Sequence, residues 1–234
     1  KAPLQAAYES LYGLTPGTLS GISQSGGKID IAIMNIIGFD ASAIGNHEFD
    51  LGTATFESII NADIAGPALA DVAHFGAQFP YLSANLDFSS DTSLSPIFNS
   101  SILANSAFET TPADVIAGTP ASSSIAEATI IDANGEPVGV IGATTQRVEI
   151  ISSPGGVTVE GGVSDNDIAL LATQLQPVVD AVALGLDGIS GTADDVNKVI
   201  LVTHLQQLSL ERTLAGLLDG VDVFIAGGSD TLLS

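Results

Sequence analysis

The chain has 234 residues, of which 27 are acidic and 5 are Lys or Arg, so its formal net charge is −22. This charge excludes nucleic acid and anionic membranes as expected partners, and it would repel a phosphate ester unless bound cations reversed the local field. The length and a hydrophobic content of 45% fit one large domain, and the lack of cysteine excludes disulfides, thiolate metal sites and cysteine nucleophiles.

The N-terminal part of the sequence predicts helices on both sides of a short strand. Residues 1–15 have apolar side chains at helical spacing, and Gly13 ends that pattern. Polar and apolar residues alternate at the start of residues 28–37, and the rest of the segment is mostly apolar. This pattern is compatible with either a helix or a strand. Residues 39–44 are expected to form a short buried strand, and residues 53–62 a helix that follows the intervening turn.

The middle of the sequence predicts strands and one loop insertion. Residues 79–88 are expected to form a strand with a polar end, and residues 89–111 are rich in Ser, Asn and Thr, as is typical of a loop. Residues 129–132 and 137–142 flank a short turn that contains Asn134-Gly135. This pattern predicts a β-hairpin.

The C-terminal part alternates helices and strands. Residues 165–184 form an amphipathic pattern, residues 199–203 predict a buried strand that ends at His204, residues 208–218 predict a helix and residues 221–226 another strand. Alternating helices and strands with one hairpin favour an α/β class of layered mixed sheets. The polar stretches between these elements are loop-sized, so no domain boundary is expected.

Targeting signals give a mixed indication of location. The longest apolar runs are broken well before membrane-spanning length, so no transmembrane helix is predicted. No basic segment followed by an apolar run marks a signal peptide at the N-terminus. Low Lys content with abundant Ser, Thr, Gly, Ala and Asp is nevertheless typical of exported bacterial proteins, so an extracellular or periplasmic location is expected.

The most informative segment is Gly-Asn-His-Glu-Phe-Asp at residues 45–50. An amide, an imidazole and two carboxylates within five positions, directly after a predicted strand, fit neither a core nor a plain surface loop. Asn46 offers a neutral oxygen ligand for a metal, and His47 offers a proton near neutral pH. The neighbouring carboxylates can orient the imidazole and stabilise its charged form.

Two other predicted strands also end in polar groups, at His204 and at Ser229-Asp230. Strand ends along one edge of a sheet are where α/β enzymes gather their ligands. A phosphoesterase that uses two metal ions needs several nitrogen and oxygen ligands around them. His, Asn and Asp suit Zn, Mn or Fe, and the sequence offers no thiolate as an alternative.

The segment GNHEFD resembles the signature of the calcineurin-like metallophosphoesterases, in the form of their bacterial 5′-nucleotidase branch. FPYLSANLDF at residues 79–88 and VILVTHLQQ at residues 199–207 resemble that branch in the same order, so the resemblance runs from about residue 28 onward. It implies an α/β fold, a layered αββα sandwich of mixed sheets that is incomplete at the N-terminus. It also implies hydrolysis of a small phosphate ester or nucleotide by metal-activated water.

The resemblance also implies roles for single residues. Asn46 and His204 would be ligands of a site that holds two divalent metal ions, such as Zn, Mn or Fe. His47 would stabilise charge on the phosphoryl group and help the leaving oxygen to depart, and Asp50 would be its carboxylate partner. These roles are carried over from the family and are not shown by spacing.

The sequence departs from the family pattern in two places. The family has D-x-H and G-D-x-x-D motifs before its GNH motif, and residues 1–44 contain neither. Its G-H-x-H motif falls on residues 227–230, where Gly228 cannot ligate a metal and Asp230 remains a candidate ligand. We therefore expect a single partial metallophosphoesterase domain over residues 1–234, without the family's C-terminal nucleotide-binding domain. The remaining parts of a larger parent chain are its expected partners, and the isolated chain is expected to have little or no activity.

An alternative from another class is a secreted, non-catalytic structural or binding module that keeps the fold with a degenerate metal site. Single residues have plainer interpretations as well. The segment 45–50 can be a helix-capping turn, and Asp230 can be the N-cap of a following turn. The ring nitrogens of His204 can simply be hydrogen-bonded to backbone groups.

Three other features are expected to lie outside the chemistry. The acidic, Gly-rich loop at residues 187–195 could hold calcium, but it lacks the twelve-residue pattern with a terminal Glu, so a solvated connector fits better. His74 is expected to be a surface or partly buried histidine. Arg147 is expected in a structural ion pair more than in a phosphate contact.

Overall fold

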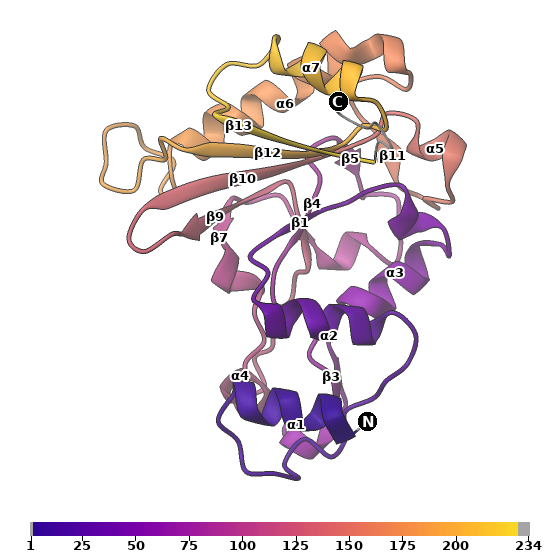
Figure 1. Cartoon of the computed structure of the whole chain (residues 1–234), viewed down its shortest axis with the longest axis vertical. Coiled ribbons are helices and arrows are strands. Elements are labelled where there is room, and N and C mark those ends of the chain that lie inside the picture. The colour runs from indigo at the N-terminus through magenta and orange to yellow at the C-terminus, as the bar shows by residue number, and fades with distance from the viewer. Residues whose placement is uncertain (1, 229–234) are drawn as a thin grey trace, which may run out of the picture.

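The computed structural model describes residues 2–228, in which two packed sheets have helices on their outer faces (Figure 1). One sheet has five strands in the order β13-β12-β10-β9-β7, and the other has four in the order β1-β4-β8-β6. Helices α6 and α7 cover the five-stranded sheet, and α2 and α3 cover the four-stranded sheet. This mixed α/β sandwich confirms the fold class predicted from the sequence.

The five-stranded sheet contains the longest strands of the protein. Its members are β7 (Leu103–Ala104), β9 (Ala128–Asp132), β10 (Pro137–Thr144), β12 (Val199–His204) and β13 (Val223–Gly227). Strands β10 and β12 are parallel, with Thr144 opposite His204 at their carboxyl ends. Strands β9 and β10 form the predicted hairpin. Asn134 and Gly135 have φ values of 60° and 88° there, as a tight hairpin turn requires.

The helices on this sheet bury one apolar face each. Helix α6 (Ile168–Ala183) places Leu171, Leu175 and Val179 in the core, and α7 (Leu208–Ala215) adds Leu214. These positions recur every three or four residues, which is the period of one helix face. The predictions for both helices and for β12 and β13 are thus confirmed, with ends that differ by a few residues.

The four-stranded sheet is built from strands of two residues each. They are β1 (Ser42–Ala43), β4 (Tyr81–Leu82), β6 (Phe98–Asn99) and β8 (Ile125–Ala126), all paired in parallel. The prediction of a buried strand over residues 39–44 was therefore wrong in extent. Phe39 is 41% exposed, and only Ile44 at the far end is fully buried.

Residues 28–37, for which the sequence left helix and strand open, form helix α2 (Lys28–Ile37). The helix ends at Gly38, whose φ of 86° lies in the left-handed region and whose N–H donates to the carbonyls of Met34 and Asn35. Helix α3 (Thr53–Ile60) follows the turn after β1, as predicted.

The prediction of one strand over residues 79–88 was wrong, because two separate strands occur there. Strand β4 is followed by β5 (Leu86–Asp87), which pairs with β11 (Thr158–Val159) outside both large sheets. Buried Asn85 interrupts the run, since its amide donates to the Thr144 carbonyl at 2.9 Å and its Oδ1 accepts from the Thr144 N–H at 2.8 Å. The Asn85 side chain therefore takes up the hydrogen-bonding capacity of the N–H and C=O of Thr144, the last residue of β10.

The two sheets come into close backbone contact at Gly142 of β10. A Cβ atom at this position would lie 2.1 Å from the carbonyl oxygen of Leu82, so only glycine fits. The Ala84 N–H also donates to the Gly142 carbonyl at 2.8 Å. The hydroxyl of Thr144, opposite His204, donates to the Ile44 carbonyl at 2.7 Å and so brings the loop after β1 beside the carboxyl end of β12.

The remaining elements are short and lie around this sandwich. They are α1 (Ala2–Leu11), β2 (Asp63–Ile64), β3 (Val72–His74), α4 (Pro112–Ala117), α5 (Val148–Ile151) and the 3-10 turns η1 (His47–Phe49), η2 (Leu69–Asp71), η3 (Ser95–Ile97), η4 (Asn105–Phe108) and η5 (Asp165–Asp167). The segment 89–111 was predicted as a loop, but it contains β6, β7 and two of these turns. In the part of the chain described, no helix has the length and apolar character needed to cross a membrane.

Two polar residues singled out in the sequence have structural surroundings. His74 is 2% exposed and thus fully buried, which corrects the expectation of a surface or partly buried histidine, and its Nε2 lies 2.8 Å from the Ile59 carbonyl. Burial lowers the pKa of His74 to about 4. Arg147 forms the expected ion pair, with its guanidinium 3.7 Å from the Asp165 carboxylate.

Candidate active site

Phe49, the apolar residue of the turn at residues 45–50, anchors this turn to the core. Phe49 is fully buried and packs edge-on against Phe56 of α3, with ring centroids 5.8 Å apart. Glu48 accepts a hydrogen bond from the Gly45 N–H at 2.7 Å and so closes the turn on itself. With Phe49 pointing into the core, His47 points outward, and its side chain is 73% exposed.

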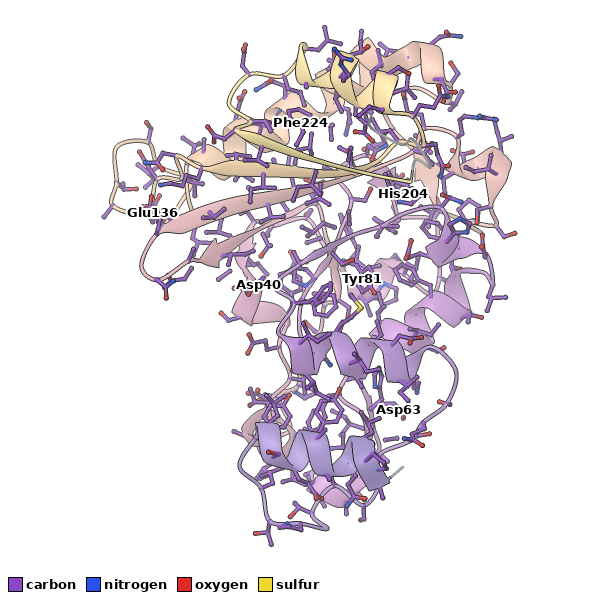
Figure 2. The ribbon with its side chains drawn as sticks, viewed as in Figure 1. Asp40, Asp63, Tyr81, Glu136, His204 and Phe224 are labelled. Carbon is purple, nitrogen blue, oxygen red and sulfur yellow. The ribbon has the colours of Figure 1, made fainter. Side chains whose placement is uncertain are left out.

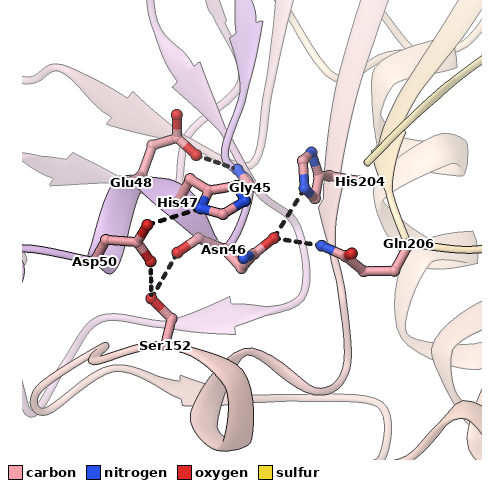
Figure 3. Close-up of polar contacts among 8 residues, drawn as sticks. All are labelled: Gly45, Asn46, His47, Glu48, Asp50, Ser152, His204 and Gln206. Carbon is pink, nitrogen blue, oxygen red and sulfur yellow. Dashed lines mark hydrogen bonds and ion pairs between the residues drawn. The ribbon is translucent and has the colours of Figure 1, made fainter. Parts of the chain in front are cut away.

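His47 and Asp50 form a direct pair across one turn of the chain. Their Nδ1 and Oδ2 atoms are 2.7 Å apart (Figure 3). The hydrogen bond to Asp50 raises the pKa of His47, and the same bond lowers the pKa of Asp50. The Nε2 atom of His47 has no hydrogen-bond partner within residues 2–228. The imidazole is thus oriented through one nitrogen while the other faces outward.

Ser152, at the end of α5, supports this pair from a distant part of the chain. Its hydroxyl lies 2.7 Å from the Asn46 carbonyl oxygen and 3.0 Å from Asp50 Oδ1. A hydroxyl has one proton, so it can donate to only one of these acceptors at a time. Either bond links the turn to the end of α5.

Asn46 and His204 meet at the shared edge of the two sheets. His204 Nε2 lies 2.9 Å from Asn46 Oδ1, and the Gln206 amide donates to the same oxygen (Figure 3). Burial is the main cause that lowers the pKa of His204, so its imidazole is neutral near pH 7. A neutral imidazole and an amide oxygen are both competent metal ligands.

Two glycines enclose the His204 ring. A Cβ at Gly45 would lie 2.8 Å from Nδ1 of His204, and a Cβ at Gly228 would lie 2.7 Å from Nε2. Gly228 also has a φ of 77°, which side chains rarely adopt. The backbone of Gly228, the position that the sequence resemblance matches to a motif histidine, lies close against the ring of His204.

The donor chemistry at Asn46 and His204 fits a divalent ion, but it supplies part of a ligand set. Among the described residues, no group of three or more His, Cys, Asp or Glu side chains is placed to hold a metal ion. Asp230, the third ligand expected from the sequence, lies outside the described residues.

The acidic loop at residues 187–195 directs its carboxylates onto its own backbone. Asp194 Oδ2 accepts from the N–H groups of Leu186 and Asp187 at 2.9 and 3.1 Å, and Asp195 accepts from Gly191 at 2.8 Å. These bonds stabilise a connector between α6 and β12. The geometry gives no support to a calcium site there.

Sequence reasoning brought together the right pairs but missed their supports. The structure places Asp50 beside His47 and His204 beside Asn46. Gln206 and Ser152 were not anticipated. Gln206 follows His204 by two residues, so proximity in sequence was an available signal, whereas Ser152 is 106 residues from Asn46 and nothing marked it.

Comparison with known proteins points to one class of protein. The chain is 31% identical over 208 residues to the trifunctional nucleotide phosphoesterase protein YfkN of Bacillus subtilis, an alignment that covers 88% of this chain and 12% of that protein. It is 30% identical over 200 residues to the 5′-nucleotidase of Mus musculus, which covers 86% of this chain and 25% of that protein. No protein-family model matches the sequence. These relatives are phosphoesterases.

Within that class, the chain is a 5′-nucleotidase-like domain of the metallophosphoesterases, homologous to part of its relatives. It spans about an eighth and a quarter of the two relatives' lengths, 12% and 25%. The solved 5′-nucleotidase precursor from Thermus thermophilus has the same fold, with a TM-score of 0.55 and 24% identity. That match covers 94% of this chain and 29% of the solved one.

Proposed function

We propose that this chain belongs to a metal-dependent phosphomonoester hydrolase of the 5′-nucleotidase type and carries one wall of its active site. The observation that carries the proposal is the pairing of His47 with Asp50 at 2.7 Å, beside the convergence of His204 and Asn46 at 2.9 Å. Homology to nucleotide phosphoesterases supports the same reaction class. No similarity favours the alternative of a non-catalytic module.

Asn46 and His204 would hold a divalent ion, together with Asp230. Their donor atoms now hydrogen-bond each other, so the proton on His204 Nε2 would have to move to Nδ1 before that nitrogen could ligate. When bound, divalent ions would neutralise phosphate charge and lower the pKa of a water molecule. A net charge of −22 makes such neutralisation necessary for an anionic substrate.

His47 would act on the leaving group. In hydrolysis, the oxygen of water forms a bond to phosphorus, the ester P–O bond breaks, and the departing oxygen needs a proton. The outward Nε2 of protonated His47 can donate that proton, because Nδ1 is held by Asp50. The raised pKa of His47 keeps a larger fraction of the imidazole protonated near neutral pH.

The wider assignments follow from the same proposal. The substrate would be a nucleotide or another small phosphate ester, and residues 1–234 would form one partial domain that works with the remaining parts of a larger parent chain. An extracellular or periplasmic location is proposed with it. A relative found in snake venom, the 5′-nucleotidase of Gloydius brevicauda, supports export as a property of related proteins.

The test is turnover of AMP and p-nitrophenyl phosphate by the longest natural form of the chain, with Zn²⁺, Mn²⁺ or no metal added. His47→Ala should lower kcat by about 10²–10⁴-fold, the usual range for loss of a general acid. Added imidazole should restore part of the activity to this variant. Asp180→Asn, an exposed change on α6, serves as the control. Full activity in His47→Ala would contradict the proposal.

A further inference from the structure

A second feature next to His47 is a pocket between α2, α3 and the turn at residues 45–50. Its volume is about 230 Å³. The apolar wall includes Met34 of α2 and Phe56 of α3, and the rim includes His47. The remaining residues that matter here are Asp30, Glu48 and Tyr81. The pocket lies away from the contact between Asn46 and His204, neither of which lines it.

Tyr81 brings an unpaired polar atom into this pocket. The residue is only 6% exposed, yet within residues 2–228 its hydroxyl has no hydrogen-bond partner. Tyr8, the other deeply buried tyrosine of this half, differs because its hydroxyl accepts from the Asn35 amide at 3.0 Å. Among the described residues no buried polar side-chain atom lacks a partner, so the Tyr81 oxygen is accessible through the pocket and is free to bond water or a ligand there. Figure 2 shows Tyr81 between the sheets and the helix layer of α2.

Among the described residues, acidic side chains outnumber basic ones around the pocket, where His47 is the one base beside two carboxylates. Asp30 and Glu48 line it, and no Lys or Arg does. Lys28, at the start of α2, is bound to Asp63 at 2.9 Å and is not among the lining residues. Burial and then the charges of Glu48 and Asp30 raise the pKa of Tyr81, so both carboxylates act on the same hydroxyl.

Carboxylates, aromatic rings and a thioether together form the surroundings that select organic cations. Ammonium groups bind against the faces of Tyr and Phe, and a flexible Met adapts to their alkyl groups. A phosphate or carboxylate group would be repelled by Asp30 and Glu48. A volume of about 230 Å³ is below the usual range for drug-sized ligands, roughly 300–1,000 Å³, so a head group fits and a whole nucleoside does not.

We propose that this pocket binds a small organic ammonium group. Resting on the proposed function, we assign it to the ammonium end of the alcohol that the hydrolase releases. His47 joins the two features, because it lines the pocket and would also protonate the leaving oxygen. The preferred substrates would then be phosphate esters of amino alcohols or of quaternary ammonium alcohols.

Met34 allows a direct test, because it is the single methionine of the chain and lines the pocket. A ¹³C-methyl label gives one methionine signal, which can be followed while choline is added to the 234-residue chain. Choline should shift this signal saturably, and 3,3-dimethyl-1-butanol, its neutral isostere, should bind at least about fivefold more weakly. Equal affinity for the two compounds, or no shift with choline, would overturn the proposal.

Variants refine the assignment. Asp30→Asn should weaken choline binding by about three- to tenfold, as expected when one nearby charge is lost in a partly screened site. Asp180→Asn makes the same chemical change on the distant α6 and should leave the affinity unchanged. Tyr81→Phe keeps the ring and removes the hydroxyl, so a smaller loss is expected. Unchanged choline affinity in Asp30→Asn, with the fold intact by circular dichroism, would overturn the proposal.

Hydrolysis then separates this proposal from the previous one. The longest natural form of the chain should show a higher kcat/KM for phosphocholine than for 3,3-dimethylbutyl phosphate, and Asp30→Asn should reduce that ratio. Binding of choline without turnover of any ester would overturn the hydrolase and leave the pocket established. Turnover without preference between the two esters would overturn the assignment to the leaving alcohol and leave the hydrolase in place.

Discussion

The two sheets of this protein are held in place in different ways. The five-stranded sheet has long strands joined by backbone hydrogen bonds and covered by the apolar faces of α6 and α7. The four-stranded sheet has strands of two residues; it also packs on an apolar core under α2 and α3, and the buried side chain of Asn85, just after β4, adds hydrogen bonds to the end of β10. The candidate site lies where the two meet, so its geometry depends on apolar packing on both sides and, on the four-stranded side, on single hydrogen bonds as well.

The comparison is tested most strongly in the core of the five-stranded sheet. Leu201 of β12 is fully buried. Leu201→Ala should lower the free energy of unfolding by about 2–5 kcal/mol, because it removes apolar contacts and leaves a cavity. Urea denaturation measures this change. Leu51→Ala, at a position that is 77% exposed, should change the stability by less than about 0.5 kcal/mol. Similar values for both would refute the packing argument.

Asn85→Ala tests the polar side of the comparison. The change leaves the N–H and C=O of Thr144 without their partner in a buried place, so a loss of about 2–4 kcal/mol is expected. NMR signals of His204 should also shift, since Thr144 pairs with it across β10 and β12. Asn197→Ala, at an exposed position, is the matched control. A loss below about 0.5 kcal/mol in Asn85→Ala would mean that the Asn85 side chain does not hold the end of β10 in place.

Buried His74, on the side of the four-stranded sheet, should make the folding stability depend on pH. Its pKa falls from 6.5 to about 4 on folding, so below pH 6.5 the unfolded chain binds a proton that the folded chain does not. Stability should therefore fall as the pH drops from 6.5 towards 4, by up to about 3 kcal/mol at about 1.4 kcal/mol per pKa unit. Urea denaturation across this range measures the slope.

The control for this prediction is His74→Gln, which cannot titrate and keeps a donor for the Ile59 carbonyl. Its stability should depend less on pH between 6.5 and 4 than that of the parent chain. An unchanged slope would assign the acid sensitivity to other groups.

Ser152→Ala should have the smallest effect. Loss of one partly buried hydrogen bond costs about 0.5–1.5 kcal/mol. The pKa of Asp50 should rise towards its ordinary value, since Ser152 is the second cause of its lowering after His47. An NMR titration of the Asp50 carboxyl carbon measures this. Ser152→Thr keeps the hydroxyl and should behave as the parent chain does; equal pKa values in all three would show that Ser152 has no influence on the pair.

The same difference explains what the sequence could predict. The strand that ends at His204 and the hairpin at Asn134-Gly135 were predicted correctly, because apolar runs and turn residues are local signals. Strands of two residues leave no such pattern, so residues 39–44 and 79–88 were assigned as longer strands than exist. Their course is set by long-range contacts such as that between Asn85 and Thr144.

The candidate site shows the same division. GNHEFD identified His47, Asp50 and Asn46, the polar end of the predicted strand over residues 199–203 identified His204, and the resemblance gave these residues their expected roles. The contact of Ser152 with Asn46 spans 106 residues, and the pocket at Tyr81 depends on how α2 packs on α3. No local pattern encodes either of these, because both arise only when the chain folds.

The glycines around His204 have a consequence for how this sequence can change. The backbone at both glycines lies close against the imidazole, which limits its rotation before any ligand arrives, so little entropy is left to lose on binding. A side chain at Gly45 or Gly228 would need the space that the ring occupies. Substitutions at these three positions should therefore depend on one another, and a histidine at position 228 becomes acceptable only after the backbone or the ring of His204 has moved.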